Sequence, residues 1–158
     1  PFAATLMTAE VYDEFLGPVG GTRTFYHGHT YTANPIGCAA ALASLDLFEE
    51  NDLLARIPPL ARDLHDGMKA LTRLPRIDDF RGLGLMGALE LVEDSDSREP
   101  LQSGHPLLRR IYREGLKRRV MLRPIGNVIY LFPPLCTTPD ELNDMLERTA
   151  ETLTEMLG

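Results

Sequence analysis

The sequence predicts a mixed α/β chain in which a helical first third is followed by an α+β layer of helices and short antiparallel strands. Three observations predict it: apolar residues at helical spacing after residues 34 and 59, period-two alternation between residues 77 and 92, and a capping signal at residue 138 that opens a terminal helix. Acidic residues end the first long helix near residue 50. We therefore expect two domains, residues 1–50 and 51–158.

The first domain should hold two helices separated by a polar loop. Thr8 can cap a short helix over residues 9–15. Residues 22–33 are too rich in glycine, histidine and hydroxyl side chains for a core strand, and they lack helical periodicity, so we expect a loop with many hydrogen-bond donors. Asn34 has the chemistry of a helix N-cap, and Pro35 suits the first helical position because its missing N–H costs nothing there.

The second domain should alternate helices with strand pairs. Its expected helices are residues 53–57, 60–71, 105–118 and 138–156, with Pro58–Pro59 separating the first two. Its expected strands are residues 77–80, 85–92, 120–123 and 128–132, the last two joined by a hairpin turn over residues 124–127. Thr138 and Glu141 form a capping box at the start of the terminal helix.

The first strand pair carries glycines and two opposite charges. Gly82, Gly84 and Gly87 predict bulges or crowded backbone, because glycine in a strand often marks close approach. We expect Arg81 and Glu90 to form a buried ion pair with a structural role.

Composition narrows the class of partner. The 158 residues carry a formal net charge of −7 and no basic stripe, which argues against nucleic acid and anionic membranes as partners. No apolar run approaches the roughly 18 to 20 residues of a membrane span. We expect a cytoplasmic protein with small-molecule or protein partners. Cys38 and Cys136 lie far apart and signal neither a disulfide framework nor a zinc site.

The loop before Asn34 has several possible roles. His27 and His29 could bind a metal, but no third ligand lies at a sensible spacing. A glycine loop that leads into a helix N-terminus suits an anion, because free backbone N–H groups and the helix dipole favour negative charge there. The alternative is a surface loop whose hydroxyl groups only cap the helix.

Arg123 and Tyr130 are candidate binding residues on the second hairpin. Arg123 ends an apolar strand and precedes Pro124, a setting in which a guanidinium can clamp a carboxylate through two hydrogen bonds. The alternative is an edge arginine that serves solubility. Tyr130 could supply an oriented hydroxyl group or belong to the core. The chain's lysines, Lys69 and Lys117, lie in polar surroundings and do not resemble catalytic amines.

Two motifs resemble those of a known family. The segment His27-Gly28-His29-Thr30-Tyr31-Thr32-Ala33-Asn34-Pro35-Ile36-Gly37-Cys38-Ala39-Ala40-Ala41 is similar to the signature of the class III (ornithine- or omega-type) aminotransferases, which use pyridoxal phosphate. The segment Leu122-Arg123-Pro124-Ile125-Gly126-Asn127-Val128-Ile129-Tyr130-Leu131-Phe132-Pro133-Pro134 resembles the biotin-pathway branch of that family. The resemblance covers essentially the whole chain and implies a fold-type I transferase.

The resemblance implies roles for five residues. Thr30, with backbone groups of Gly28 and His29, matches the element that reaches across a homodimer interface to the cofactor phosphate of the neighbouring subunit. Arg123 matches the arginine that binds the substrate carboxylate, and Tyr130 matches a tyrosine of the substrate site. Other family members have Pro or His at position 29, so that side chain is not expected to be essential.

The resemblance also implies that other parts lie outside this sequence. In the family, the lysine that forms a Schiff base with the cofactor precedes a segment similar to Pro1–Leu6, and family chains are more than twice as long. We therefore expect a C-terminal portion, comprising the end of the large domain and the small domain, that is inactive alone and has no catalytic residue of its own.

The function implied for the complete enzyme is transfer of an amino group to 8-amino-7-oxononanoate, giving 7,8-diaminononanoate, with S-adenosylmethionine or lysine as the donor. Two alternatives stay open. One is another omega-aminotransferase, acting on ornithine, putrescine or lysine. The other is a truncated, non-catalytic module that dimerises or complements a separate N-terminal half.

Overall fold

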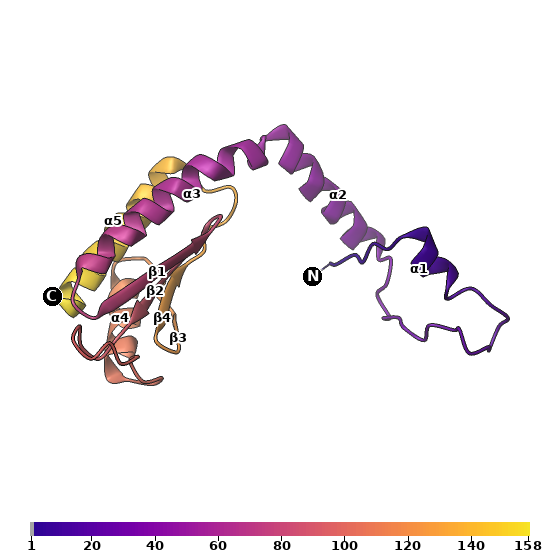
Figure 1. The fold of residues 1–158 in the computed structure, drawn as a ribbon. Coiled ribbons are helices and arrows are strands. Elements are labelled where there is room, and N and C mark those ends of the chain that lie inside the picture. Colours follow the sequence, from indigo (N-terminus) through magenta and orange to yellow (C-terminus); the bar gives the residue numbers. More distant parts are fainter. Residues whose placement is uncertain (1) are drawn as a thin grey trace. The chain divides into compact units, whose positions relative to one another are not determined.

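The computed structural model describes residues 2–158 and divides into two compact units at residues 51 and 52 (Figure 1). We call residues 1–51 unit 1 and residues 52–158 unit 2. No helix of the described residues is long and apolar enough to cross a membrane.

Unit 1 contains two helices, α1 (Ala9–Asp13) and α2 (Pro35–Glu50). The Thr8 side chain accepts from the N–H of Val11 at 3.5 Å, which confirms the predicted cap. Asn34 caps α2 through its side-chain oxygen, and Pro35 occupies the first helical position, also as predicted. Residues 14–34 are irregular apart from turns.

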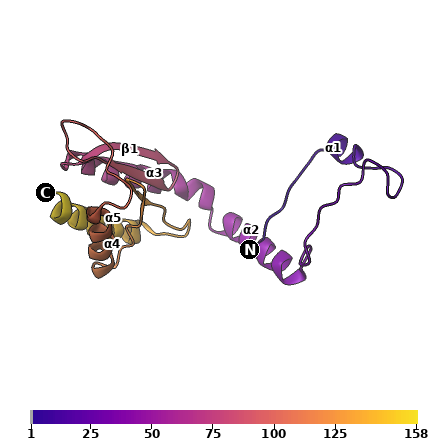
Figure 2. The ribbon, with the colours of Figure 1, turned by 90° about the horizontal axis from the view of Figure 1, so that it is seen from below.

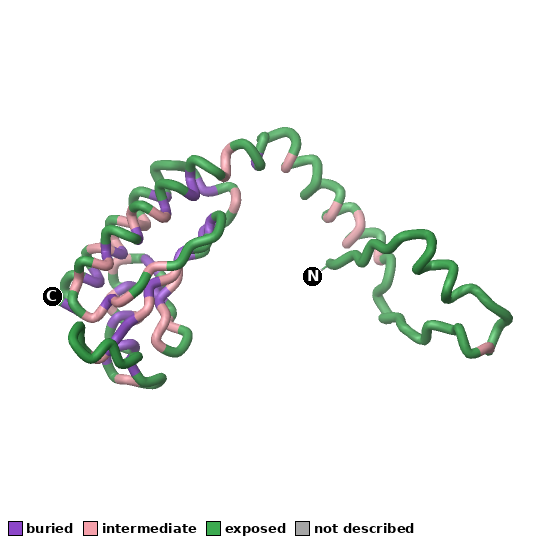
Figure 3. The backbone as a smooth tube through the Cα atoms, viewed as in Figure 1, coloured by how far each residue is buried: buried purple, intermediate pink, exposed green. Residues whose placement is uncertain are grey.

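Unit 1 has no core among its described residues: none of residues 2–51 is buried (Figure 3). Many of its large apolar side chains are exposed, including Leu6, Val11, Phe15, Val19, Phe25, Tyr31, Ile36, Leu42 and Leu45. Because burial of apolar surface is the main source of folding free energy, nothing within unit 1 stabilises it strongly.

Unit 2 contains three long helices, one 3₁₀ turn and a four-stranded sheet. The helical elements are α3 (Leu53–Lys69), η1 (Ala70–Arg73), α4 (Pro106–Lys117) and α5 (Pro139–Leu157). The strands are β1 (Ile77–Leu83), β2 (Met86–Leu91), β3 (Pro124–Ile125) and β4 (Val128–Leu131). The strands are antiparallel in the order β1-β2-β4-β3, which confirms the expected α/β architecture. The predicted capping box of Thr138 and Glu141 opens α5.

The sheet has one covered face and one open face. Leu89, Leu91, Ile129 and Leu131 are buried and belong to the main core cluster, together with side chains of α3, α4 and α5. Helix α5 contacts both α3 and α4, and Figures 1 and 2 show the three helices gathered beside the sheet. The alternate residues Ala88, Glu90, Val128 and Tyr130 are only partly buried, so they lie on the open face.

The expected break at Pro58 and Pro59 is wrong, because both prolines lie inside the continuous helix α3. They are exposed, whereas Leu53, Leu60 and Leu64 are buried along the face that packs on the core. A proline removes one backbone donor. Here the buried face of α3 offsets that loss, so the helix continues.

The second predicted hairpin exists, but its first strand is shifted. Residues 120–123 are not a strand; β3 is Pro124–Ile125, and the turn contains only Gly126 and Asn127. Gly126 has φ of +60°, which glycine adopts without steric cost. A two-residue turn fits the twist of antiparallel strands, so pairing begins closer to the turn than predicted.

Two side-chain predictions for unit 2 also need correction. Arg81 and Glu90 do form an ion pair, at 2.8 Å, but it is not buried, because 59% of the Arg81 side chain is exposed. The spacing of Leu108, Ile111 and Leu116 also predicts that Leu116 lies on the apolar side of α4, but Leu116 is exposed and Leu107 is buried instead. The crowding predicted at Gly87 is confirmed: an added Cβ atom would lie 2.3 Å from Sδ of Met68.

Candidate functional site

The β3–β4 hairpin brings two of the predicted site residues together. Its register pairs Pro124 with Ile129 and Ile125 with Val128. Continuing this register by one residue places Arg123 opposite Tyr130, and directly opposite residues of an antiparallel pair project to the same face. Tyr130 in turn pairs with Ala88 of β2. The hairpin therefore presents a guanidinium and a phenol on the open side of the sheet.

A cavity of about 400 Å³ lies beside these two side chains. Arg123 and Tyr130 are its polar side chains. The other lining residues are apolar: Val120, Met121, Leu131, Phe132, Pro133, Pro134 and Met145. We call this the Arg123–Tyr130 cavity. Its composition suits a ligand with an aliphatic body and one anionic end.

Within residues 2–158, the Arg123 guanidinium makes no ion pair and no hydrogen bond to another residue. Most other arginines around the sheet are paired: Arg76 with Glu93, Arg81 with Glu90 and Arg98 with Asp78. Arg123 is also exposed. Its donors are therefore available for a carboxylate, which a guanidinium binds through two parallel hydrogen bonds.

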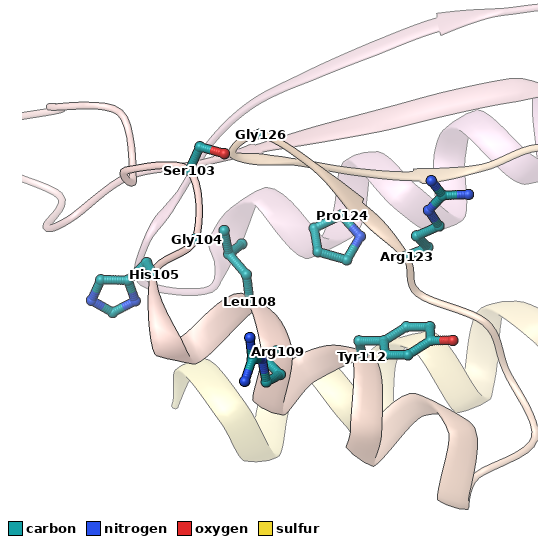
Figure 4. Close-up of a pocket in the computed structure, with 9 residues that line it drawn as sticks. All are labelled: Ser103, Gly104, His105, Leu108, Arg109, Tyr112, Arg123, Pro124 and Gly126. Atoms are coloured by element: carbon teal, nitrogen blue, oxygen red, sulfur yellow. The ribbon is translucent and has the colours of Figure 1, made fainter.

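A second cavity of about 400 Å³ shares Arg123 and lies between α4 and the hairpin (Figure 4). Tyr112, Leu108 and Pro124 form its apolar surfaces, and Arg109 also lines it. In Figure 4 the guanidinium groups of Arg109 and Arg123 point in different directions. The two arginines therefore do not form a single clamp in this arrangement.

The other three predicted site residues, Gly28, His29 and Thr30, belong to unit 1. The N–H of His29 donates to the hydroxyl of Thr32 at 3.1 Å, and the N–H of Thr32 donates back to the carbonyl of His29 at 3.0 Å. His27 and His29 meet edge to face with ring centroids 5.1 Å apart. The loop thus closes on itself between residues 29 and 32.

The hydrogen-bond donors without a protein partner lie in the loop, and not at the N-terminus of α2 as expected. Asn34 Oδ1 accepts from the N–H of Ile36 at 2.9 Å and of Gly37 at 3.4 Å, so these helix donors are already satisfied. Within the described residues, the N–H groups of Gly28 and Thr30 and the Thr30 hydroxyl have no protein partner. An added Cβ atom at Gly28 would meet nothing within 4 Å. Any anion held here would therefore bind to the loop rather than to α2.

The remaining candidate groups have ordinary surroundings. Lys69 is exposed, and Nζ of Lys117 is paired with Glu114 at 2.6 Å. Cys38 and Cys136 are both free thiols. Residues 2–158 contain no cluster of three His, Cys, Asp or Glu side chains that could hold a metal ion.

The sequence predicted an apolar hairpin around Arg123, but not that two of its apolar side chains stay exposed. Met121 and Phe132 flank the hairpin and are exposed, although both belong to segments with strand-like hydrophobicity. Sequence reasoning also missed Asn127, which had been assigned only to the turn. A register counted outward from Gly126–Asn127 would have placed Arg123 opposite Tyr130.

The chain belongs to the class III aminotransferases: residues 1–153 match that family. Among curated relatives, the adenosylmethionine-8-amino-7-oxononanoate aminotransferase of Geobacter sulfurreducens is 45% identical over 98% of this chain, and that of Methanocaldococcus jannaschii is 40% identical over 98%.

Solved structures agree with the family. The Methanocaldococcus jannaschii enzyme superimposes with a TM-score of 0.87 at 38% identity, over 94% of this chain and 34% of that one. An amine transaminase from an uncultivated Pseudomonas species, determined in its PLP-bound form, gives 0.79 at 38% identity, over 88% and 32%. The fold is thus that of the PLP-dependent aminotransferases. The chain spans 35% of the Geobacter relative and 34% of the Methanocaldococcus one.

Proposed function

We propose that this chain is the C-terminal part of a pyridoxal 5'-phosphate-dependent aminotransferase that transfers an amino group to 8-amino-7-oxononanoate, giving 7,8-diaminononanoate in biotin synthesis. One observation carries the proposal: the unpaired guanidinium of Arg123 lies with Tyr130 on an otherwise apolar cavity. That arrangement suits a keto acid with a carboxylate at the end of an aliphatic chain. The names of the relatives support the same substrate, and S-adenosylmethionine as the amino donor.

In this proposal the residues of the Arg123–Tyr130 cavity bind and orient the keto acid. Arg123 holds the carboxylate through two charge-assisted hydrogen bonds. Tyr130 orients the substrate through its hydroxyl group, and Met121 and Phe132 exclude water from the aliphatic body. Holding the far end of a flexible substrate reduces the entropy lost when its carbonyl carbon reaches the reacting position.

In this proposal the loop of Gly28, His29 and Thr30 holds the cofactor phosphate through Gly28 and Thr30, because the N–H of His29 is already donated to the hydroxyl of Thr32. The free amide groups of Gly28 and Thr30 and the Thr30 hydroxyl are the kind of donors that a phosphate accepts, so the loop fits this group. When bound, the cofactor supplies an electron-withdrawing ring that stabilises negative charge on the carbon bearing the amine. The enzyme is a homodimer in which this loop serves the neighbouring subunit.

We further propose that residues 1–50 are the end of the large cofactor-binding domain and that residues 51–158 are the small domain. The exposed apolar side chains of unit 1 are consistent with a segment that packs on more polypeptide. The lysine that attaches the cofactor then lies in the part of the enzyme that this chain does not span. The isolated 158-residue chain is accordingly inactive.

Replacing Arg123 in the complete enzyme tests the substrate assignment. Arg123→Ala should raise KM for the keto acid by about tenfold to a hundredfold, because a charge-assisted hydrogen bond contributes about 1.5–3 kcal/mol. The KM of Arg123→Lys should lie between those of the wild type and Arg123→Ala, since an ammonium group cannot bind both carboxylate oxygens in the same plane. Cofactor retention should not change. An unaltered KM in Arg123→Ala would contradict the assignment.

Two alternative functions can be separated by experiment. One is another omega-aminotransferase activity, because solved omega-transaminases share the fold, with a TM-score of 0.77 at 29% identity for the Pseudomonas jessenii enzyme. This alternative is tested by comparing transamination rates of the complete enzyme with four substrates: ornithine, putrescine, lysine and 8-amino-7-oxononanoate. The other alternative is a non-catalytic module that only dimerises or complements a separate N-terminal half. To test for such a module, the chain is mixed with pyridoxal 5'-phosphate, with and without an N-terminal half, and passed through gel filtration. Cofactor absorbance should stay with the protein only when the N-terminal half is present.

A further inference from the structure

The turn between β3 and β4 is tied to the neighbouring strand by one residue, Asn127. Its Nδ2 donates to the carbonyl of Leu91 at 3.0 Å and to Oε1 of Glu90 at 3.2 Å. Its own carbonyl accepts from the N–H of Leu91 at 2.9 Å. Three hydrogen bonds therefore join this turn residue to the end of β2.

The carboxylate of Glu90 links the turn to β1 as well. Its second oxygen, Oε2, accepts from Nη1 of Arg81 at 2.8 Å. One carboxylate thus binds the turn through one oxygen and β1 through the other. Hydrogen bonds to an ionised group are stronger than neutral ones, and Glu90 is only 28% exposed. We call these three side chains the Arg81–Glu90–Asn127 network.

The segment that carries Arg123 is held from both sides. Leu122, which directly precedes Arg123, is fully buried in the core. Strand β3 contains two residues and forms the edge of the sheet, so only one of its sides is paired. One of the two residues, Pro124, has no N–H to donate. Arg123 directly precedes this short strand. On the C-terminal side of Arg123, the side-chain hydrogen bonds of Asn127 fix the turn that follows this short strand.

The network also affects the charge near Arg123. Glu90 lies on the same open face as Tyr130, and an unpaired carboxylate there would compete with a substrate carboxylate for the Arg123 guanidinium. In the structure Arg81 and Asn127 occupy one oxygen of Glu90 each. Both oxygens of Glu90 are thus already bound, and Arg123 has no ion-pair partner among residues 2–158.

We propose that Asn127, held by Glu90 and Arg81, is a positioning residue that fixes the β3–β4 turn and so aims Arg123 at the substrate carboxylate. This inference rests on the proposed function of Arg123. Asn127 acts through the hairpin and does not itself contact substrate.

Steady-state kinetics of the complete enzyme with three variants tests this. Asn127→Ala should raise KM for the keto acid by about threefold to tenfold, which corresponds to the net contribution of about one hydrogen bond, with kcat within about twofold. Asn127→Asp keeps the side-chain size but cannot donate and adds charge beside Glu90. Asn127→Asp should raise KM at least as much as Asn127→Ala. If Asn127 acted only by packing, Asn127→Asp would raise KM less than Asn127→Ala. Asp78→Asn is the control, because it breaks an equivalent ion pair of β1, with Arg98, that does not reach the hairpin.

A double variant shows whether Asn127 acts through Arg123. If it does, Asn127→Ala should not raise KM further in an enzyme that already carries Arg123→Ala. An equal increase in both backgrounds, or no increase in either, would overturn the inference.

Hydrogen exchange measures the structural link independently of activity. The amide of Leu91, which donates to the turn, should exchange faster in Asn127→Ala and not in Asp78→Asn. Unchanged exchange would contradict the claim that Asn127 fixes the turn. If Arg123→Ala alone leaves KM unchanged, the proposed role of Arg123 fails, whereas a KM increase in Arg123→Ala with no effect of Asn127→Ala rejects only the positioning role.

Discussion

Removing residues 1–51 should leave the cooperative unfolding of unit 2 intact. Every buried residue of the described chain lies in unit 2, so unit 2 holds the core and unit 1 contributes no buried apolar side chain to it. The unfolding enthalpy near 60 °C is about 0.7 kcal/mol per residue, which gives about 75 kcal/mol for the roughly 107 residues of unit 2. If all 158 residues unfolded together, the enthalpy would be about 110 kcal/mol.

Differential scanning calorimetry of two polypeptides, residues 1–158 and residues 52–158, measures these values. We expect one transition of about 75 kcal/mol in both, with midpoints within about 4 °C of each other. A polypeptide of residues 1–51 is the control. It should show no transition, because none of its described residues is buried and helices in proteins are stabilised mainly by tertiary packing. A transition about 35 kcal/mol smaller in residues 52–158, or no transition at all, would refute the reasoning.

Three further predictions concern unit 2. Gly115→Ala should destabilise unit 2 by about 1–3 kcal/mol in urea unfolding, because an added Cβ atom would lie 2.8 Å from the carbonyl of Val120. Leu153→Ala should cost about 2–5 kcal/mol in the same assay, since this core side chain is fully buried. Hydrogen bonds from the backbone and then the side chain of Thr138 lower the pKa of Glu141 below its usual value, so the stabilisation by this carboxylate is present above about pH 4.3 and is lost as pH falls through the lower folded pKa. The difference in Tm between the wild type and Glu141→Gln should therefore shrink below that pH, and a constant difference would contradict this role.

Local signals in the sequence were sufficient for most elements. The caps at Thr8, Asn34 and Thr138 act within three residues of their own positions, so they were predicted correctly. The predicted helix break at Pro58 and Pro59 was wrong, because proline's local tendency to end a helix is overridden here by tertiary packing. The buried face of α3, rather than the residues next to the prolines, determines that the helix continues.

The strand register also could not be predicted from local sequence signals. The hairpin signal was present in the sequence, but the length of the turn was not. A turn of two residues instead of four moves the residue opposite Arg123 from Val128 to Tyr130. Neither the pairing of Tyr130 with Ala88 nor the three hydrogen bonds of Asn127 could be predicted, because they join residues 36 to 42 positions apart. Such contacts depend on how the strands assemble.

The sequence by itself determined the family, the caps, the strand-rich middle and the residues Gly28, His29, Thr30, Arg123 and Tyr130 as candidates, because these depend on local motifs. Only the tertiary structure decided that Arg123 has no ion-pair partner among residues 2–158, that it shares a cavity with Tyr130, and that every buried residue of the described chain lies in residues 52–158. The physical reason is that burial and side-chain pairing are properties of segments brought together by folding, and no single segment encodes them alone.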